Sequence, residues 1–71
     1  MKGSELLRKL KKHGREVGLD VRYVKERGKG SHGTLYFGKR FAVVPDLKQE
    51  LKTGTLRAIL ARLGLTPEDL K

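Results

Sequence analysis

The 71-residue sequence predicts a two-layer α+β domain, in which two helices cover one face of a three-stranded antiparallel sheet. Three observations lead to this prediction. A helical leucine spacing opens the chain, an alternating period of two follows it, and a second helical leucine spacing comes near the end. A hydrophobic content of 37% can fill one modest core, so we expect residues 1–71 to form a single domain.

The first helix is predicted to begin at Ser4 and to end at Gly14. Ser4 is followed by Glu5 and by leucines at positions 6, 7 and 10, which is the pattern of an N-capped amphipathic helix. Gly14 can take the left-handed conformation that ends many helices. His13 would then lie in the last turn, where an imidazole interacts well with the free carbonyl groups, and we assign it this structural role.

The strands are predicted from an alternation that starts at Val17 and continues through Leu19, Val21 and Tyr23. Two more strands are expected at 34–37 and 40–44. The two residues between them, Gly38 and Lys39, suit a type II′ turn, and the proline at position 45 cannot continue a strand ladder.

Strand alternation also assigns the aromatic side chains to faces of the sheet. Tyr23, Phe37 and Phe41 are expected to point into the core. Tyr36 has the opposite parity to Phe37 and is expected to face out, on the same face as Thr34 and residue 32. Tyr36 is therefore the aromatic side chain best placed to meet a nucleic-acid base.

The second helix is predicted from residue 53 to Gly64. Leucine or isoleucine at positions 56, 59, 60 and 63 forms its apolar stripe, and a polar connector at 46–52 precedes it. Thr66 and Pro67 are followed by two acidic residues, which predicts one last short helical turn.

The charge of the chain indicates a polyanionic partner. There are 17 Lys and Arg residues against 8 Asp and Glu residues, a net charge of +9. The alternatives are a solvated basic surface and, less well supported, binding to an anionic membrane. No apolar run approaches the roughly 18 to 20 residues of a membrane span, and no signal segment opens the chain, so we expect a cytoplasmic protein.

A glycine-rich stretch crowded with cations, residues 25–31, ends at a histidine. An imidazole can accept or donate a proton near neutral pH, and glycines let a phosphate approach the backbone. With no cysteine and only two histidines, 19 positions apart, the chain has a poor set of metal ligands. The candidate catalytic residue is His32, and the candidate phosphate-binding residues around it are Lys25, Arg27, Lys29, Gly30 and Ser31.

RNA cleavage by transesterification needs a base, a cation and an acid. His32 can supply one of the two proton transfers, and the lysines and arginine can supply the charge. The second proton-transfer group is not evident: Tyr36, Lys39 or a water molecule are the alternatives. A non-catalytic interpretation is also open, in which His32 is an exposed strand-edge residue and the glycines form an ordinary turn.

The order of elements resembles the double-stranded-RNA-binding domain. Five ordered segments also resemble the HicA family of toxin mRNA interferases, over about residues 2 to 65. These segments are residues 1–8, Lys11-Lys12-His13-Gly14, Gly30-Ser31-His32, Val43-Val44-Pro45 and residues 51–60.

The HicA resemblance implies a fold like that of the double-stranded-RNA-binding domain and metal-independent cleavage of mRNA by the histidine of the Gly-Ser-His element, here His32. It implies a HicB antitoxin as partner, which masks the active site, and no cofactor. Many members carry a second histidine where this chain has Gly33, the segment 14–29 is longer than usual, and the hairpin at 38–39 is short.

Two other functions are compatible with the sequence. One is a non-catalytic module that binds double-stranded RNA by shape and phosphate contacts. The other is a small basic protein that binds an acidic protein partner. In either case Arg57 and Arg62, which fall off the leucine stripe of the second helix, are expected to add to the basic surface together with the sheet face and the loop cations.

Overall fold

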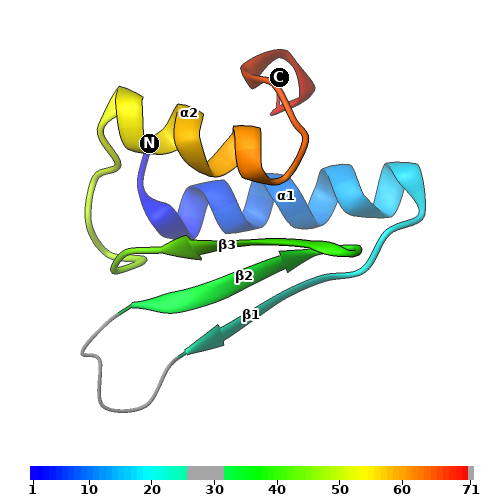
Figure 1. The fold of residues 1–71 in the computed structure, drawn as a ribbon, viewed down its shortest axis with the longest axis horizontal. Helices are drawn as coiled ribbons and strands as arrows, with labels where there is room; N and C mark the ends of the chain where they lie inside the picture. The colour runs from blue at the N-terminus through cyan, green and yellow to red at the C-terminus, as the bar shows by residue number, and fades with distance from the viewer. Residues whose placement is uncertain (26–31, 71) are drawn as a thin grey trace.

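The computed structural model describes residues 1–25 and 32–70. Its elements follow the predicted order of helix, three strands and helix (Figure 1). The strands pair antiparallel with β2 in the centre, so the predicted α+β class and the order of the double-stranded-RNA-binding domain are confirmed. The elements are α1 (Gly3–Val17), β1 (Val21–Lys25), β2 (Gly33–Phe37), β3 (Arg40–Val44), α2 (Thr53–Arg62) and the short 3-10 helix η1 (Pro67–Leu70).

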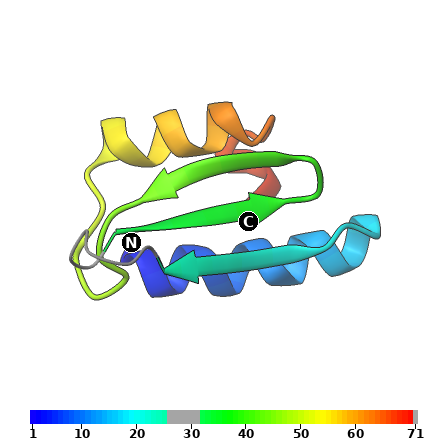
Figure 2. The same ribbon diagram turned by 60° about the horizontal axis from the view of Figure 1, so that its bottom comes forward.

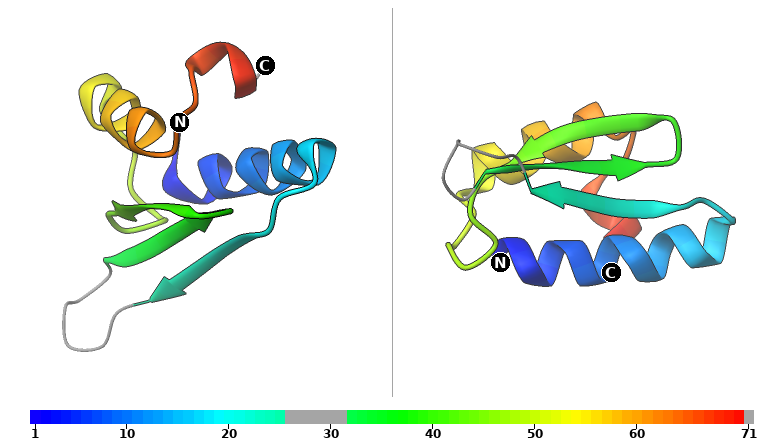
Figure 3. Two further views of the ribbon diagram at one scale, coloured as in Figure 1. Left: turned by 45° about the vertical axis from the view of Figure 1, so that its right-hand side comes forward. Right: turned by 90° about the horizontal axis from the view of Figure 1, so that it is seen from below.

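Both helices lie on one side of the sheet, as the left-hand view of Figure 3 shows. The hydrophobic core fills the space between these layers, and it takes leucines and isoleucine from the helices and the inward side chains of β2 and β3. In the right-hand view of Figure 3, no helix lies in front of the strands. The buried core residues are Leu6, Leu10, Leu35, Phe37, Ala42, Val44, Leu51, Ile59, Leu60, Leu63 and Leu70.

The start of α1 differs from the prediction. Ser4 was expected to cap the helix, but α1 begins at Gly3, and no side chain caps it. The connector after β3 satisfies the first backbone donors instead: the Ser4 N–H donates to the Leu47 carbonyl at 2.9 Å, and the Gly3 N–H donates to the Gln49 carbonyl at 3.2 Å. This close approach requires a glycine, because a Cβ on Gly3 would lie 2.9 Å from the Leu47 Cα.

The end of α1 is also later than predicted. The helix runs through Gly14 to Val17, and Gly18 takes the left-handed conformation with φ 75°. Gly14 is instead buried against β1, where a Cβ would lie 2.5 Å from a methyl carbon of Val21. His13 is therefore not in the last turn, and its ring stacks on Phe37 with centroids 5.9 Å apart and an interplanar angle of 13°.

Strand β1 is correspondingly shorter than predicted. Val17 belongs to the helix and Leu19 to the connection, and both are exposed, at 52% and 44%. Val21 and Tyr23 alternate toward the core as predicted, and each is half-buried.

The β2–β3 hairpin has the predicted turn and the predicted β3, while β2 begins one residue earlier than predicted, and the turn lies at the right-hand end of the sheet in Figure 2. Gly38 has φ 61° and Lys39 has no positive φ, which fits a type II′ turn. The prediction for Phe41 was wrong. Tyr36 pairs with Phe41 across the hairpin, and directly opposed residues share a face, so Phe41 points outward and is 56% exposed.

The second half of the chain closes the core. The connector at 46–52 was expected to be polar, but it contributes to the core: Leu51 is buried, and Leu47 packs against the core. Helix α2 presents its predicted stripe, and Gly64 follows it with φ 75°. In η1 the Asp69 carboxylate accepts hydrogen bonds from the backbone and the hydroxyl of Thr66, as the predicted cap requires.

Candidate active site at the end of the central strand

His32 immediately precedes β2, and its side chain is exposed. The next residue, Gly33, pairs with Lys25 of β1 on one side and with Val44 of β3 on the other. Strands β1 and β3 both end at these partners. His32 therefore lies at the end of the sheet where all three strands can contribute neighbours, and its side chain is exposed there.

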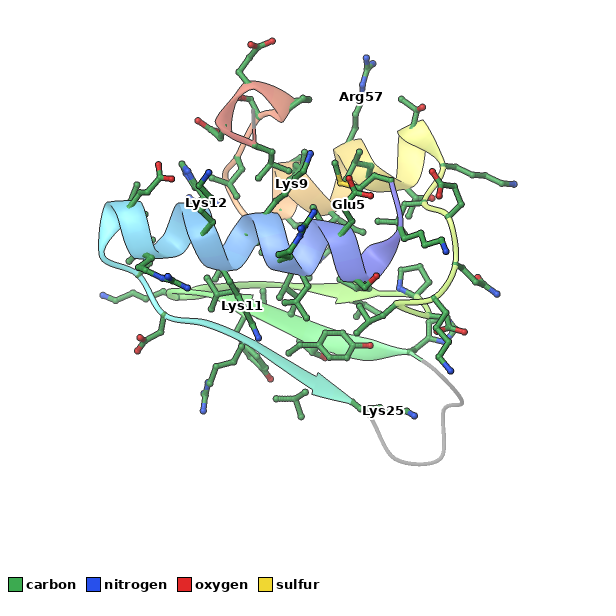
Figure 4. The ribbon with its side chains drawn as sticks, turned by 180° about the vertical axis from the view of Figure 1, so that it is seen from behind. Glu5, Lys9, Lys11, Lys12, Lys25 and Arg57 are labelled. Atoms are coloured by element: carbon green, nitrogen blue, oxygen red, sulfur yellow. The ribbon has the colours of Figure 1, made fainter. Side chains whose placement is uncertain are left out.

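Among the residues of the described strands, Lys25 is the cation whose register position is nearest to His32. It is exposed and stands directly opposite Gly33, one residue along β2 from the histidine. Opposed Cα atoms in an antiparallel pair are about 4.5–5.5 Å apart. Directly opposed residues share a face, so Lys25 starts from the face of Gly33, whereas residue 32 alternates to the other face. The labelled Lys25 in Figure 4 thus supplies a flexible ammonium group at this end of the sheet.

Gly33 leaves no room for a side chain directly after His32. A Cβ built there would lie 2.5 Å from the Oη and Cζ atoms of Tyr23 and 2.8 Å from the carbonyl oxygen of Val24. The Tyr23 ring covers the strand at this point, and burial, followed by the nearby Asp46 carboxylate, raises the pKa of the Tyr23 phenol. The absence of a second histidine at position 33 thus has a steric basis.

Tyr36 faces out from the sheet, as predicted. It belongs to the same outward row as Arg22 of β1 and Phe41 of β3. The Arg22 guanidinium lies 5.9 Å from the centroid of the Tyr36 ring, and the Phe41 ring centroid lies 6.1 Å away. Tyr36 is 37% exposed, so part of its ring remains accessible between these neighbours.

The structure does not bring all the predicted residues together. Lys39 lies in the turn after β2, at the opposite end of that strand from His32, about 16 Å or more away at about 3.3 Å per residue. Arg57 projects from α2 on the far side of the helical layer, as its position opposite Lys25 in Figure 4 shows. Arg27, Lys29, Gly30 and Ser31 lie outside the described residues.

This geometry bears on the second proton-transfer group. Tyr36 is four residues along β2 from His32, about 13 Å, and side chains on one face of a strand stand roughly parallel. Tyr36 and Lys39 are thus both too far along the strand to act on the same phosphate group as His32. Of the three alternatives, water is the one that this spacing leaves beside His32.

A comparison with protein families identifies the chain's relatives. The sequence model described as the HicA toxin of bacterial toxin-antitoxin systems matches residues 3–65. This chain belongs to the HicA toxin family. The match covers all the elements from α1 to α2 and includes His32. No curated protein and no solved structure matches the chain.

Membership of the HicA family makes this chain a toxin of the toxin-antitoxin type, with an antitoxin as the implied partner. Among the helices that the structure describes, none is long and apolar enough to cross a membrane. In the described ranges 1–25 and 32–70, no group of three His, Cys, Asp or Glu residues is placed to hold a metal ion.

One basic feature of the HicA toxin was not predicted as a site. A hollow between α1 and η1 is lined by four basic side chains, together with Glu16, Asp69 and Leu70. The spacing of four residues between positions 8 and 12 and between 9 and 13 places them along one side of α1. Because Asp69 belongs to a helical turn far along the chain, only the fold reveals this hollow. The four basic residues are Arg8, Lys9, Lys12 and His13.

Proposed function

We propose that this HicA toxin is an mRNA interferase, an endoribonuclease that cleaves mRNA in the cytoplasm with His32 as a general acid or base. The supporting observation is the exposed imidazole at the end of the central strand, at an end of the sheet that also carries Lys25, in a chain of net charge +9. Family membership supports a toxin, and the residue roles are inferred from this placement.

The proposed reaction is an intramolecular transesterification. A base removes the proton of the ribose 2′-hydroxyl, and the 2′-oxygen attacks the adjacent phosphorus while the bond from phosphorus to the 5′-oxygen breaks. An acid protonates the leaving 5′-oxygen. The products are a 2′,3′-cyclic phosphate on one fragment and a 5′-hydroxyl on the other. The atoms and charges of the reaction balance without a metal or cofactor.

In this scheme His32 performs one of the proton transfers, and water is the candidate for the other. Negative charge develops on the nonbridging phosphate oxygens in the transition state, and a nearby ammonium group stabilises it. Lys25, at the same end of the sheet, is the described cation proposed for this role. Arg27 and Lys29 are proposed to add charge, and Gly30 and Ser31 to donate hydrogen bonds to the phosphate.

The decisive experiment compares induced expression of the wild-type chain and of His32→Ala. General acid–base groups contribute about 10²- to 10⁴-fold to rate, so the variant should lose growth arrest and leave transcripts intact. Arg15→Ala is the control, because this exposed cation lies in the last turn of α1 and not at the strand end. Equal toxicity of the wild type and His32→Ala would refute the proposal.

Cleavage by the purified protein distinguishes the remaining alternative. A product ending in a 2′,3′-cyclic phosphate, formed equally well in the presence of a chelator, is the expected result. A protein that binds RNA with a strong salt dependence, equally with and without His32, and yields no such product would instead be a non-catalytic RNA-binding module.

The antitoxin implied by the family is proposed to be a HicB-like protein that covers this strand end. A partner with acidic groups would occupy the cations that the phosphates otherwise contact. Co-expression of a neighbouring HicB-like protein should therefore restore growth in the wild-type arm of the same experiment. Continued growth arrest at matched protein levels would count against this partner.

A further inference from the structure

The outward face of the sheet is strongly apolar for a surface that no helix covers. Its side chains form two rows across the three strands, set by the register. The row nearer to His32 is Val24, Thr34 and Val43, and the next row is Arg22, Tyr36 and Phe41. Four of these six are large hydrophobic side chains exposed by 37% to 56%. We call these six residues the outer face.

The aromatic row of the outer face has the geometry of a stacking surface. The Tyr36 and Phe41 rings are tilted by 43° with centroids 6.1 Å apart, and both side chains are partly exposed. The Arg22 guanidinium lies over the Tyr36 ring at 5.9 Å. Aromatic rings and guanidinium planes on an open sheet are surfaces on which unpaired bases stack.

Cations border this row, and acidic side chains do not interrupt it. Arg62 of α2 shares a hollow with Phe41 and Val43 along the edge of β3, and Lys39 lies exposed in the adjacent turn. None of the described residues of the three strands is acidic. An apolar surface with a cationic border complements a single nucleic-acid strand, whose bases are apolar on their faces and whose phosphates are anionic.

We infer that the outer face binds single-stranded RNA, with Phe41 and Tyr36 as the stacking surface for bases beside the cleavage site. This inference rests on the proposed function for its biological meaning. Tyr36 lies about 13 Å along the strand from His32, so a stacked base belongs to a nucleotide that flanks the scissile phosphate. Phe41 and Tyr36 are thus positioning residues for the strand and do not touch the reacting atoms.

The same surface selects against duplex RNA. Bases inside a duplex already stack on each other, so their faces cannot reach Phe41 or Tyr36. A duplex would gain only phosphate contacts from the cationic border. The outer face therefore predicts a preference for single strands, in contrast to a module that binds double-stranded RNA by shape.

The test measures RNA binding in the His32→Ala background, where no cleavage occurs. The probe is an unstructured oligoribonucleotide of mixed sequence that contains 2-aminopurine, whose fluorescence falls when the base stacks. Phe41→Ala should weaken binding by about 5- to 150-fold and abolish the fluorescence change, since stacking on one aromatic ring is worth that much. Phe41→Leu should lose most of the affinity, and Tyr36→Phe should retain it.

The matched control is Val17→Ala, which removes an equally exposed aliphatic side chain from the end of α1. Far-UV circular dichroism confirms that each variant folds. The same probe annealed to its complement should bind more weakly and respond less than about twofold to Phe41→Ala.

Several results would overturn the inference. Equal affinities for Phe41→Ala and Val17→Ala would do so, and so would equal losses on single-stranded and duplex probes. Full affinity of Phe41→Leu, or an effect of Phe41→Ala only on antitoxin binding or on self-association, would assign the outer face to a protein partner. If the wild type cleaves RNA normally and Phe41→Ala does too, this inference fails while the proposed function stands. If neither the wild type nor Phe41→Ala cleaves RNA but the Phe41-dependent fluorescence change of the probe persists, the proposed function fails and this inference stands.

Discussion

The two faces of the central sheet are built from the same strands and differ sharply in burial. On the inner face Leu35, Phe37, Ala42 and Val44 are between 1% and 4% exposed. On the outer face Tyr36, Phe41 and Val43 are between 37% and 56% exposed, although they are just as apolar. The difference is that α1 and α2 supply leucines to the inner face and nothing described covers the outer one. An apolar face retained without a cover is characteristic of a binding surface.

The largest expected effect on stability comes from comparing two single substitutions, one that truncates a side chain on the inner face and one that truncates a side chain on the outer face. Leu35→Ala leaves a cavity in the centre of the core and should lower the free energy of unfolding by about 2–5 kcal/mol. A domain of this size has about 4–11 kcal/mol in total, so the loss is severe. Val43→Ala should cost less than about 1 kcal/mol, because Val43 is 54% exposed. Urea denaturation measures both.

Equal losses of unfolding free energy in Leu35→Ala and Val43→Ala would contradict the difference between the two faces. Such a result would mean that the outer face is buried in solution, for example in a dimer. Measuring the denaturation midpoint at two protein concentrations separates the cases, because only a dimer gives a midpoint that depends on concentration.

A smaller effect tests how closely α1 sits on the sheet. Gly14→Ala improves helix propensity by about 1 kcal/mol, but its Cβ would lie 2.5 Å from a Val21 methyl carbon and 2.9 Å from the Leu19 carbonyl oxygen. We expect a net loss of about 1–2 kcal/mol in unfolding free energy. The control is Gly54→Ala in α2, where nothing lies within 4 Å, and it should gain about 0.5–1 kcal/mol. Stabilisation by both would show that α1 packs less tightly.

The smallest effect concerns η1, which places Leu70 in the core. The backbone N–H of Thr66 donates a hydrogen bond to the Asp69 carboxylate, and this bond is the main cause that lowers the pKa of Asp69. Burial raises that pKa, whereas the Thr66 hydroxyl and His13 lower it further. Because the pKa of Asp69 is lowered in the folded state, its carboxylate stabilises the fold at pH values above the unfolded-state pKa of about 3.9. This stabilisation is lost as the pH falls through the lower folded-state pKa.

Asp69→Ala should therefore be slightly less stable than the wild type at neutral pH and should match it in strong acid. Urea midpoints of both proteins measured between neutral pH and the acid limit of folding provide the check. A difference that does not shrink toward low pH would show that the carboxylate's charge is not what matters.

Sequence reasoning was reliable for local patterns and failed where a distant segment intervened. The hairpin and the stripe of α2 were predicted correctly, because Gly38-Lys39 and the leucine spacing are local signals. The N-terminus of α1 was predicted wrongly, because the carbonyls of Leu47 and Gln49 accept hydrogen bonds from the N–H groups at the start of the helix, which begins at Gly3 with no side-chain cap. No local pattern reports such a partner.

Phe41 is an error of a different kind. Its outward direction follows from the two-residue turn, since the turn sets Phe37 opposite Arg40 and hence Tyr36 opposite Phe41. The prediction assigned Phe41 to the core by alternation within its own strand, without the pairing across the turn that fixes which parity faces inward. The candidate site shows the same division: His32 could be named from its neighbours in sequence, whereas the distance to Tyr36 and Lys39 required the strand geometry.

The sequence by itself determined the order of elements, the charge, the hairpin and the candidate imidazole, because each depends on residues close together in the chain. The tertiary structure decided where α1 begins and ends, why Gly33 has no room for a side chain, and that Arg57 and Lys39 lie away from His32. It also decided that Phe41 joins Tyr36 on an open face. These features depend on which surfaces meet, and that is set by the packing of segments far apart in sequence.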